Sequence, residues 1–165
     1  MHTVEMAALR HEDVADSETL GSGPVHRSLA TWKVVLLVAA GGALGTMLRF
    51  GLSVLVPTVT TPTLVEVPWA TLTVNVLGCL VLGGLNGVLQ IAPLRPWIHP
   101  LLGTGLCGGF TTMSTVVLEG SAMIGADFPL LALSYAGLTL VLCLGAVVLG
   151  LLLGRRLAER GGASA

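Results

Sequence analysis

The sequence is poor in charged and in aromatic side chains. Of its 165 residues, 10% are charged and 4% are aromatic, and the formal net charge is −1 at pH 7. A chain without a basic excess offers no electrostatic footprint for nucleic acid, so a nucleic-acid partner is not expected. In contrast, 53% of the residues are hydrophobic, a composition that together with the low charge is far from the soluble average. We therefore expect an integral membrane protein that contacts lipid.

The chain also lacks the residue patterns of metal and catalytic sites. Its three cysteines, Cys79, Cys107 and Cys143, all lie in apolar segments, without a CxxC pair or neighbouring histidines. We interpret them as small buried hydrophobic residues rather than as disulfide partners or zinc ligands. No nucleophile stands beside a candidate base, so an enzyme is not expected.

Four long apolar segments predict four transmembrane helices. Each segment reaches the ~20 residues needed to cross a hydrocarbon core of ~30 Å. Trp32, Trp69 and Trp97 lie at segment ends, where interfacial anchors are found. The expected fold is all-α, an integral membrane four-helix bundle that occupies residues 31–156. The apolar segments cover residues 32–56, 69–91, 98–124 and 129–153.

The two ends of the chain predict polar tails on one side of the membrane. Residues 1–30 are polar and acidic and predict a disordered tail, and residues 157–165 predict a short C-terminal tail. Six basic residues lie in the tails and in the second loop, whereas the first and third loops carry only Glu66 and Asp127. The positive-inside rule then places both termini in the cytoplasm, with the chain as a multi-pass protein of the cell (plasma) membrane. The six basic residues are Arg27, Lys33, Arg95, Arg155, Arg156 and Arg160.

The third apolar segment contains an unusual stretch at residues 102–119. Gly108 and Gly109 are followed by Phe110 and then by two β-branched threonines, Thr111 and Thr112. Adjacent glycines lower helix propensity by about 1 kcal/mol each, and threonine hydroxyls compete for backbone carbonyls. A broken helix at membrane depth survives only where it is buried in protein, lines water or binds an ion. From composition alone, a broken third helix and a continuous helix that packs closely through its glycines both remain open.

Two charged residues lie well inside predicted spans. Arg49 lies deep in the first segment, and Glu119 is the only acid well inside a span. A guanidinium in the membrane must face protein or water, and by charge Glu119 is its natural partner. We favour a structural polar contact between them over a transported-ion site.

Neutral polar side chains form a second pattern. Thr71 and Asn75 are four residues apart and share one face of the second helix, while Ser114 and Thr115 follow the glycine-threonine stretch. Hydroxyl and amide hydrogens can replace the water around a small, tightly hydrated anion without trapping it. The alternative is that these groups only hydrogen-bond between helices. The residues alone do not decide between the two.

Glycine pairs four residues apart recur in the first three segments. Such small-xxx-small rows allow close backbone approach, which drives helix association in lipid. They are compatible with tight packing in the bundle and with dimerisation. The pairs are Gly41 with Gly45, Gly83 with Gly87, and Gly105 with Gly109.

Three motifs in this chain resemble the CrcB/Fluc family of fluoride channels. They are GGALG at residues 41–45 followed by Arg49, TLTVNVLG at residues 71–78, and GTGLCGGFTTMST at residues 103–115. The third string is long and specific, and the resemblance covers roughly residues 34–153, all four segments.

The resemblance implies a fluoride-selective channel that lets fluoride leave the cytoplasm passively and so reduces fluoride toxicity. It implies an antiparallel dimer of two inverted four-helix subunits, with the third helix broken and two narrow pores. It also implies a structural Na⁺ at the dimer centre, held by the backbone carbonyls of Gly108 and Thr111. The family's pore asparagine and hydroxyl track match Asn75, Thr71, Ser114 and Thr115, and its arginine and glutamate match Arg49 and Glu119.

This chain departs from the family at two pore positions. The family's third-helix motif carries phenylalanines whose ring edges face fluoride, but this chain has Met113 and Val116 there. Phe110 precedes the two threonines and replaces neither ring. On this resemblance, the subunit cannot supply the aromatic box by itself, although Met113 and Val116 still line the pore.

The charge bias and the missing rings together predict a heterodimer. A protein that pairs with an inverted copy of itself should have balanced loop charges, whereas this chain is strongly biased. We expect an oppositely biased homologous partner that supplies the rings. One alternative is a non-conducting structural subunit of such a channel. A small proton-coupled multidrug exporter is disfavoured, because the first segment has no acid and Glu119 lies in the wrong setting.

Overall fold

The computed structural model describes residues 29–56, 68–92 and 94–162. Within these residues it contains four helical regions long and apolar enough to cross a membrane, at Thr31–Leu55, Trp69–Ile91, His99–Gly125 and Pro129–Gly161. The predicted all-helical, multi-pass membrane protein with four apolar spans is confirmed. Nearly all of the predicted N-terminal tail, Arg27 and the first loop with Glu66 lie outside the described residues.

Three of the spans are single helices and one is built from three pieces. The single helices are α2 (Thr31–Leu55), α3 (Trp69–Ile91) and α6 (Pro129–Gly162). The third span consists of η1 (His99–Cys107), a π-helical stretch, then α4 (Gly108–Phe110) and α5 (Ser114–Gly125). Helix α6 continues beyond the predicted apolar segment and takes in most of the predicted C-terminal tail.

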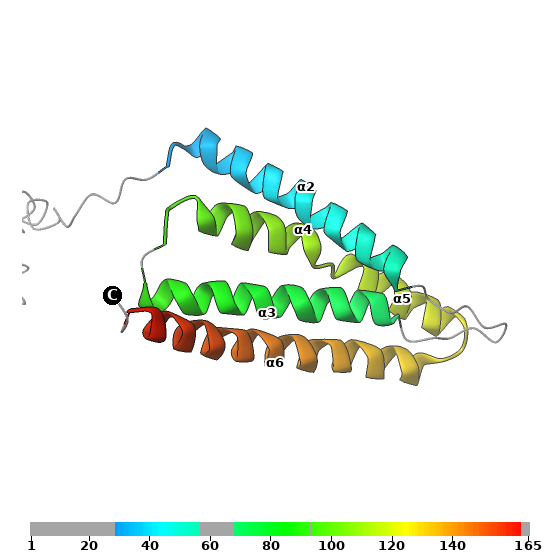
Figure 1. Ribbon diagram of the computed structural model, residues 1–165. Coiled ribbons are helices and arrows are strands. Elements are labelled where there is room, and N and C mark those ends of the chain that lie inside the picture. Colours follow the sequence, from blue (N-terminus) through cyan, green and yellow to red (C-terminus); the bar gives the residue numbers. More distant parts are fainter. Residues whose placement is uncertain (1–28, 57–67, 93, 163–165) are drawn as a thin grey trace, which may run out of the picture.

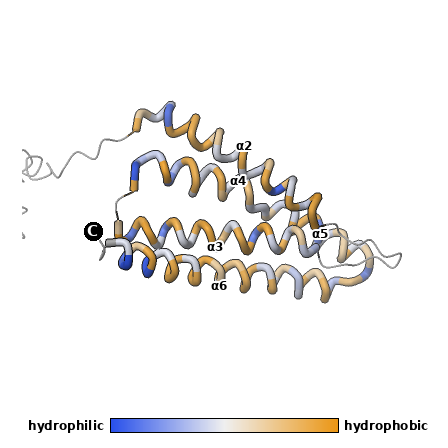
Figure 2. Tube along the Cα trace, viewed as in Figure 1, coloured by the Kyte–Doolittle hydropathy of each residue, from blue (hydrophilic) through white to orange (hydrophobic). Residues whose placement is uncertain are grey.

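The helices pack as two pairs. Helix α2 lies along η1 and α4, and α3 lies along α6 over nearly its whole length, while α5 packs against α6 (Figure 1). The start of α2 and the C-terminal end of α6 lie at the same end of the bundle (Figure 1). Figure 2 shows that apolar residues dominate all four spans and that hydrophilic residues gather mainly at their ends.

Glycines on both helices bring α3 and α6 together. A Cβ added at Gly83 would overlap the Val147 carbonyl oxygen, and one at Gly87 would overlap that of Leu151. On α6, Gly150 and Gly154 face α3 in the same way. The Gly150–Gly154 row is visible in the sequence but is not among the rows predicted above.

The other glycine rows join α2 to the third span. A Cβ at Gly41 would overlap the Leu101 carbonyl oxygen, and one at Gly45 would overlap that of Leu106. Gly109 faces the backbone of Gly42 at equally close range. The predicted close packing through the glycine rows is confirmed, but within one chain, so these glycine faces are not free for a dimer contact.

Gly83 and its neighbour Gly84 offer a direct test of this packing. We expect Gly83→Ala to destabilise the bundle by about 1–3 kcal/mol, because the new methyl group must push α6 away. Gly84→Ala is the matched control, since its Cβ would meet the Gly150 carbonyl oxygen at an ordinary 3.7 Å. Thermal unfolding of both variants in detergent measures the difference. Equal melting temperatures would contradict the packing.

A tight turn reverses the chain between α5 and α6. Asp127 has a φ of 66°, and the N–H groups of Asp127 and Phe128 donate to the carbonyls of Ile124 and Met123. This is a Schellman motif, in which the left-handed residue is usually glycine and sometimes a short polar residue. The turn ends α5 and starts α6 antiparallel to it.

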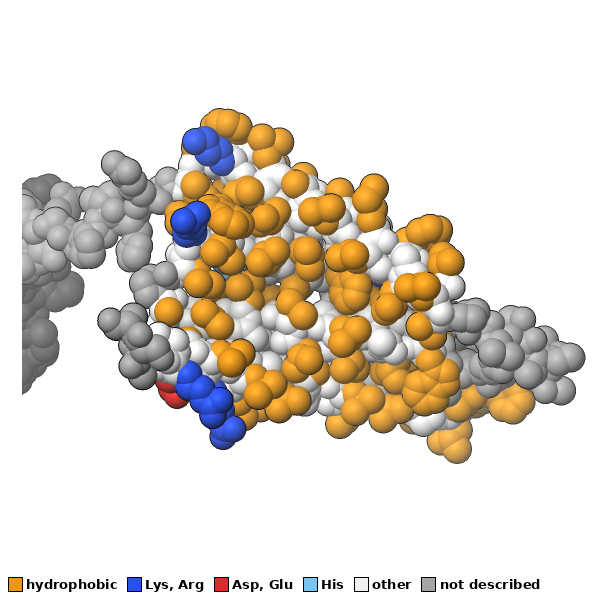
Figure 3. Space-filling model, viewed as in Figure 1, with side chains coloured by type: hydrophobic (Ala, Val, Ile, Leu, Met, Phe, Trp, Pro, Cys, Tyr) orange, Lys and Arg blue, Asp and Glu red, His pale blue; other side chains and the backbone are white. Residues whose placement is uncertain are grey.

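The surface is apolar around the bundle and basic at one end. In Figure 3 hydrophobic side chains cover most of the visible face, and Lys and Arg side chains gather at the end where α2 begins and α6 ends. The described basic residues other than Arg49 lie near those helix ends: Lys33, Arg95, Arg155, Arg156 and Arg160.

Candidate functional site

Residues 111–113 leave the helical conformation between α4 and α5. Thr111 is extended, with a ψ of 155°, and α5 begins only at Ser114. The paired glycines, where sequence considerations placed the irregular point, are themselves helical. The non-helical residues are the threonines that follow them and Met113. Tertiary hydrogen bonds from the Asn75 side chain to Thr112 explain the position.

The Asn75 side chain binds the backbone of this irregular segment. Its Nδ2 donates to the Thr112 carbonyl at 2.9 Å, and its Oδ1 accepts from the Thr112 N–H at 2.7 Å. Asn75 and Thr112 are both buried, so these two bonds satisfy groups that lipid could not satisfy. The Asn75 side-chain amide therefore replaces the backbone groups with which Thr112 would pair in a continuous helix.

Several backbone carbonyls lose their helical partners at this segment, those of Gly108 and Thr111 among them. In a continuous helix the Thr112 N–H would bond to the Gly108 carbonyl, and the Thr115 N–H to the Thr111 carbonyl. Here the Thr112 N–H donates to Asn75 Oδ1 instead. The Thr115 N–H donates to Thr112 Oγ1 at 3.3 Å. Gly108 is exposed on the surface of the subunit, and an added Cβ there would meet nothing within 4 Å.

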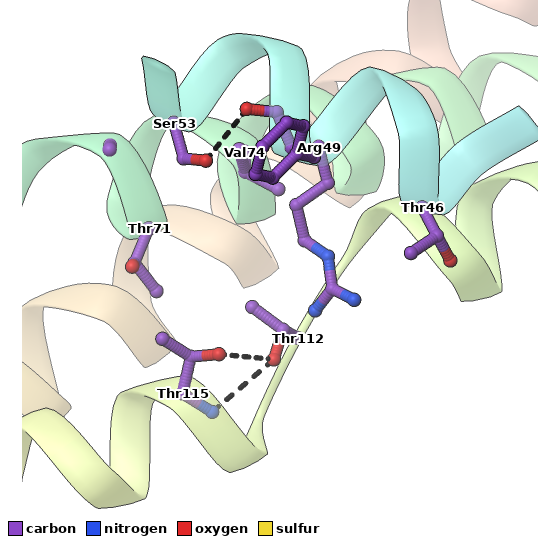
Figure 4. A pocket seen from close by; sticks show the side chains of 9 residues that line it. Thr46, Arg49, Ser53, Thr71, Val74, Thr112 and Thr115 are labelled. Carbon is purple, nitrogen blue, oxygen red and sulfur yellow. Dashed lines mark hydrogen bonds between the residues drawn. The ribbon is translucent and has the colours of Figure 1, made fainter.

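A polar cavity opens on one side of the irregular segment, with a volume of about 360 Å³. The Arg49 side chain extends into it from α2 toward the segment that holds Thr112 (Figure 4). Five hydroxyl side chains and one guanidinium line it, and none of the carboxylates in the described part of the chain does. The lining residues are Thr46, Arg49, Phe50, Ser53, Ala70, Thr71, Val74, Thr112 and Thr115.

The hydroxyls of this cavity already form a small network. Thr112 Oγ1 lies 2.9 Å from Thr115 Oγ1 and 3.3 Å from Ser114 Oγ, and Figure 4 shows the contacts between Thr112 and Thr115. The Thr112 hydroxyl also caps the start of α5 through the Thr115 N–H. Thr112 thus links the cavity wall to the end of the irregular segment.

The expected contact between Arg49 and Glu119 is wrong for this chain. Glu119 accepts hydrogen bonds from Thr71 Oγ1 and from Tyr135 Oη, each at 2.7 Å. These two donors, from α3 and α6, occupy both carboxylate oxygens. Arg49 is half-buried and makes no hydrogen bond or ion pair with any residue that the structure describes. Arg49 therefore lines the cavity without an ion pair to any acid that the structure describes, while Glu119 is hydrogen-bonded to Thr71 of the cavity wall.

A narrower groove of about 220 Å³ lies on the other side of residues 111–113. Asn75, Thr111 and Thr112 form its polar part together with Thr139 of α6. Apolar and sulfur-containing side chains form the rest of its wall: Cys79, Met113, Val116, Ala136, Leu140 and Cys143. Because Thr112 lines both spaces, the irregular segment separates the cavity from the groove.

Most of the predicted site residues meet around this segment. Thr71 and Thr115 line the cavity, and Asn75, Met113 and Val116 line the groove. Val116 is also part of a buried cluster with Met123, Ala132 and Tyr135. Ser114 lines neither space and is exposed, although its hydroxyl touches that of Thr112.

Sequence considerations missed several polar residues of the site. Thr112 stands in the third-span motif but was not assigned a role, and Tyr135 and Thr139 lie on α6. Tyr135 and Thr139 are four residues apart and almost fully buried. A polar pair at this spacing in the most apolar span is a usable signal, because one helix face then carries both groups.

The chain matches a known protein family over most of its length. Residues 36–151 match the model of the family described as CrcB-like protein, Camphor Resistance (CrcB). Fluoride-specific ion channel FluC 2 of Bacillus subtilis is 40% identical over 126 residues, which cover 76% of this chain and 91% of that protein. Fluoride-specific ion channel FluC 1 of Mycobacterium bovis is 41% identical over 130 residues, or 78% of this chain and 96% of that protein. Fluoride-specific ion channel FluC of Erythrobacter litoralis is 40% identical over 123 residues, which cover 73% of this chain and 90% of that protein.

Proposed function

Because this chain belongs to the CrcB family, which is a family of ion channels and not of enzymes, we propose that it is a subunit of a fluoride-selective channel. The channel lets fluoride leave the cytoplasm passively and so reduces fluoride toxicity. The observation that carries the proposal is the irregular segment at residues 111–113, placed between a hydroxyl-lined cavity and a groove that begins at Asn75.

The charge balance of the cavity favours an anion. Arg49 extends into a space lined by hydroxyl groups, and no described carboxylate lines it. A guanidinium without a protein counter-ion raises the local concentration of anions, because the field is not cancelled nearby. The Thr46, Ser53 and Thr71 hydroxyls donate to Gly42, Phe50 and Glu119. The Thr112 and Thr115 hydroxyls, which contact each other, are therefore the cavity groups that would replace water around a small ion.

Asn75 retains hydrogen-bonding capacity toward the groove. A primary amide carries two N–H donors, and the described contacts use one of them, toward the Thr112 carbonyl. The remaining N–H is available to an anion in the groove, whose wall includes Asn75. A neutral donor binds fluoride without the deep trap that a full positive charge would create.

The freed carbonyls fit a structural Na⁺. The Gly108 and Thr111 oxygens, which the family resemblance assigns to this ion, are the two whose helical amides are diverted to side chains. Backbone carbonyls are hard ligands, as a hard cation requires, and helices interrupted in membranes commonly bind cations in this way. Two carbonyls are too few for a complete shell, so the same two oxygens of a second subunit would share the ion. When bound, the cation supplies positive charge that balances these oxygens.

Sodium is expected to stabilise the purified channel specifically. Above the dissociation constant, each tenfold rise in Na⁺ should raise the free energy of unfolding by about 1.4 kcal/mol, because the ion binds only the folded dimer. Melting temperatures in NaCl and in the chloride of a large organic cation, at equal ionic strength, measure the effect. The same stability in both salts would contradict the Na⁺ site.

We further propose that the subunit functions in an inverted, antiparallel dimer with an oppositely oriented homologue. The cavity and the groove are open at membrane depth, and polar groups there must be covered by protein or water. All described Lys and Arg residues except Arg49 lie near one end of the bundle, so the positive-inside rule places that end, with both termini, in the cytoplasm. An equally biased copy would not insert upside down, so the partner is a homologue with the reverse bias.

Met113 and Val116 favour a second candidate, a non-conducting subunit that supports a channel built mainly by its partner. Met113 is exposed beside the groove, and Val116 is only 3% exposed. Neither offers the positive ring edge of an aromatic side chain to an anion. In a heterodimer the partner's rings would line the pore, and this chain would contribute Asn75 and the hydroxyls.

Deleting the gene in the organism that encodes this chain tests the function. We expect the cells to retain fluoride and to stop growing at a fluoride concentration that the parent strain tolerates. A plasmid copy of the full chain should restore growth, and a copy with Asn75→Ala should not. Unchanged fluoride tolerance in the deletion strain would contradict the proposed function.

A further inference from the structure

Two of the three cysteines do not have the buried positions that the sequence led us to expect. Cys107 is buried, at 2% exposure, but Cys79 and Cys143 are only partly buried. Both of these line the groove that also contains Asn75, and all three thiols are free. The prediction of a small buried hydrophobic residue is confirmed for Cys107 alone.

The two groove cysteines line the same space from the two helices of the α3–α6 contact, Cys79 from α3 and Cys143 from α6. The two helices are held close here, since Gly83, one turn beyond Cys79, packs on the backbone of Val147, one turn beyond Cys143. Cys79 follows Asn75 by four residues and Cys143 follows Thr139 by four, so each thiol continues the polar face of its helix.

The groove offers sulfur and no hard charged ligand. Met113 adds a thioether to the same wall, and no carboxylate or imidazole among the residues that the structure describes lines the groove. The described residues contain no group of three or more His, Cys, Asp or Glu side chains that could hold a metal. This argues against a four-coordinate zinc site, whereas soft sulfur ligands suit soft ions of low coordination number.

We propose that Cys79 and Cys143 form a binding site for a soft, two-coordinate metal ion such as Hg²⁺, Ag⁺ or Cu⁺, with the Met113 thioether as an additional weak ligand. The step is a ligand exchange without oxidation. With mercuric chloride, two S–H bonds and two Hg–Cl bonds break, two Hg–S bonds form, and two protons and two chloride ions are released. The bridge joins α3 to α6 beside Asn75.

A bound metal changes the groove in two ways. It fills part of the groove, which has a volume of about 220 Å³. It also links α3 to α6, and both helices contribute side chains to the groove wall. If the groove carries fluoride, which rests on the function proposed above, metal binding should also lower fluoride flux. Metal binding itself does not depend on that function.

The experiment uses the purified full-length channel and mercuric chloride as the probe. Intact-protein mass spectrometry distinguishes a bridged adduct, which has lost two protons and keeps no chloride, from a singly attached adduct that retains chloride. We expect the bridged adduct in the wild-type chain and in the control variant Cys107→Ala, which keeps both groove thiols. Cys79→Ala and Cys143→Ala should each form only singly attached adducts. Fluoride efflux is measured on the same samples.

The possible outcomes separate the site from the proposed function. A bridged adduct that requires both groove cysteines, with slower fluoride efflux, supports the site and the groove as a pathway. A bridged adduct with unchanged efflux supports the site and contradicts the groove as a pathway. Only singly attached adducts in the wild-type chain, or a bridged adduct that survives Cys79→Ala, would overturn the site.

Discussion

Replacement of Asn75 with alanine is expected to lower fluoride efflux by at least about tenfold, which corresponds to ~1.4 kcal/mol or more in the barrier to permeation. The variant removes the amide that faces the groove and leaves the Thr112 N–H and carbonyl without their side-chain partners. Unpaired buried backbone groups cost about 1–3 kcal/mol each, so the irregular segment should also lose its defined conformation. Fluoride release from liposomes that contain this chain together with its partner subunit, followed with a fluoride electrode, measures the effect.

Asn86→Ala is the matched control for this experiment. Asn86 lies on the same helix, is partly buried, and makes no side-chain hydrogen bond to the residues that the structure describes. Its replacement should leave efflux within about twofold of the wild type, since it loses no buried contact. Melting temperatures of both variants show whether each is folded. Normal efflux from a folded Asn75→Ala channel would remove Asn75 from the pathway and favour the non-conducting subunit.

The second large effect is the dependence of fluoride efflux on a partner subunit. We expect this chain, expressed alone in a host without related channels, to give no fluoride efflux above that of empty liposomes. Coexpression with an oppositely biased homologue from the same organism should restore it by about a hundredfold or more, because the pathway is then enclosed by protein. The physical reason is that the basic residues at one end of the bundle impose a single orientation.

The control for this prediction reduces the charge bias between the two ends of the bundle and leaves the site residues unchanged. Exchanging Arg155 and Arg156 for glutamine and adding two lysines near Asp127, in the turn between α5 and α6, should let some copies insert upside down. Protease access to a C-terminal tag reports the orientation in cells. If the unmodified chain alone inserts in both orientations and conducts, the heterodimer proposal is contradicted while the channel itself stands.

The overall arrangement could be predicted from the sequence because lipid imposes simple rules. Apolar segments of sufficient length had to become helices, and Trp69 marked the start of α3. Glycines four residues apart indicated close contacts, which the structure places at Gly41 and Gly83. These signals are local in the chain, so no knowledge of the tertiary structure was needed.

The detailed conformation of the third span could not be predicted in this way. Glycine propensity pointed to Gly108 and Gly109, yet the helix leaves its regular form only at Thr111. The decisive groups belong to another helix, because the Asn75 amide supplies both partners of the Thr112 backbone. A local propensity scale cannot contain that contact.

The Arg49–Glu119 expectation failed for a related reason. Opposite charges in one apolar chain suggested a pair, but the hydroxyls of Thr71 and Tyr135 reach both carboxylate oxygens. Opposite charge does not show which way two side chains point in the bundle. The rotation of each helix about its axis decides which hydrogen-bond donors face Glu119. The consequence is functional, since Arg49 then faces the hydroxyl-lined cavity instead.

Halide efflux from liposomes that contain the assembled channel tests the central claim most directly. Liposomes with this chain and its partner are loaded with potassium fluoride or with potassium chloride, and release is started with a potassium carrier. The arrangement of Asn75, Arg49 and the hydroxyls predicts rapid fluoride release and chloride release that stays near the level of empty liposomes. Equal release of both halides, or release of neither, would contradict the account.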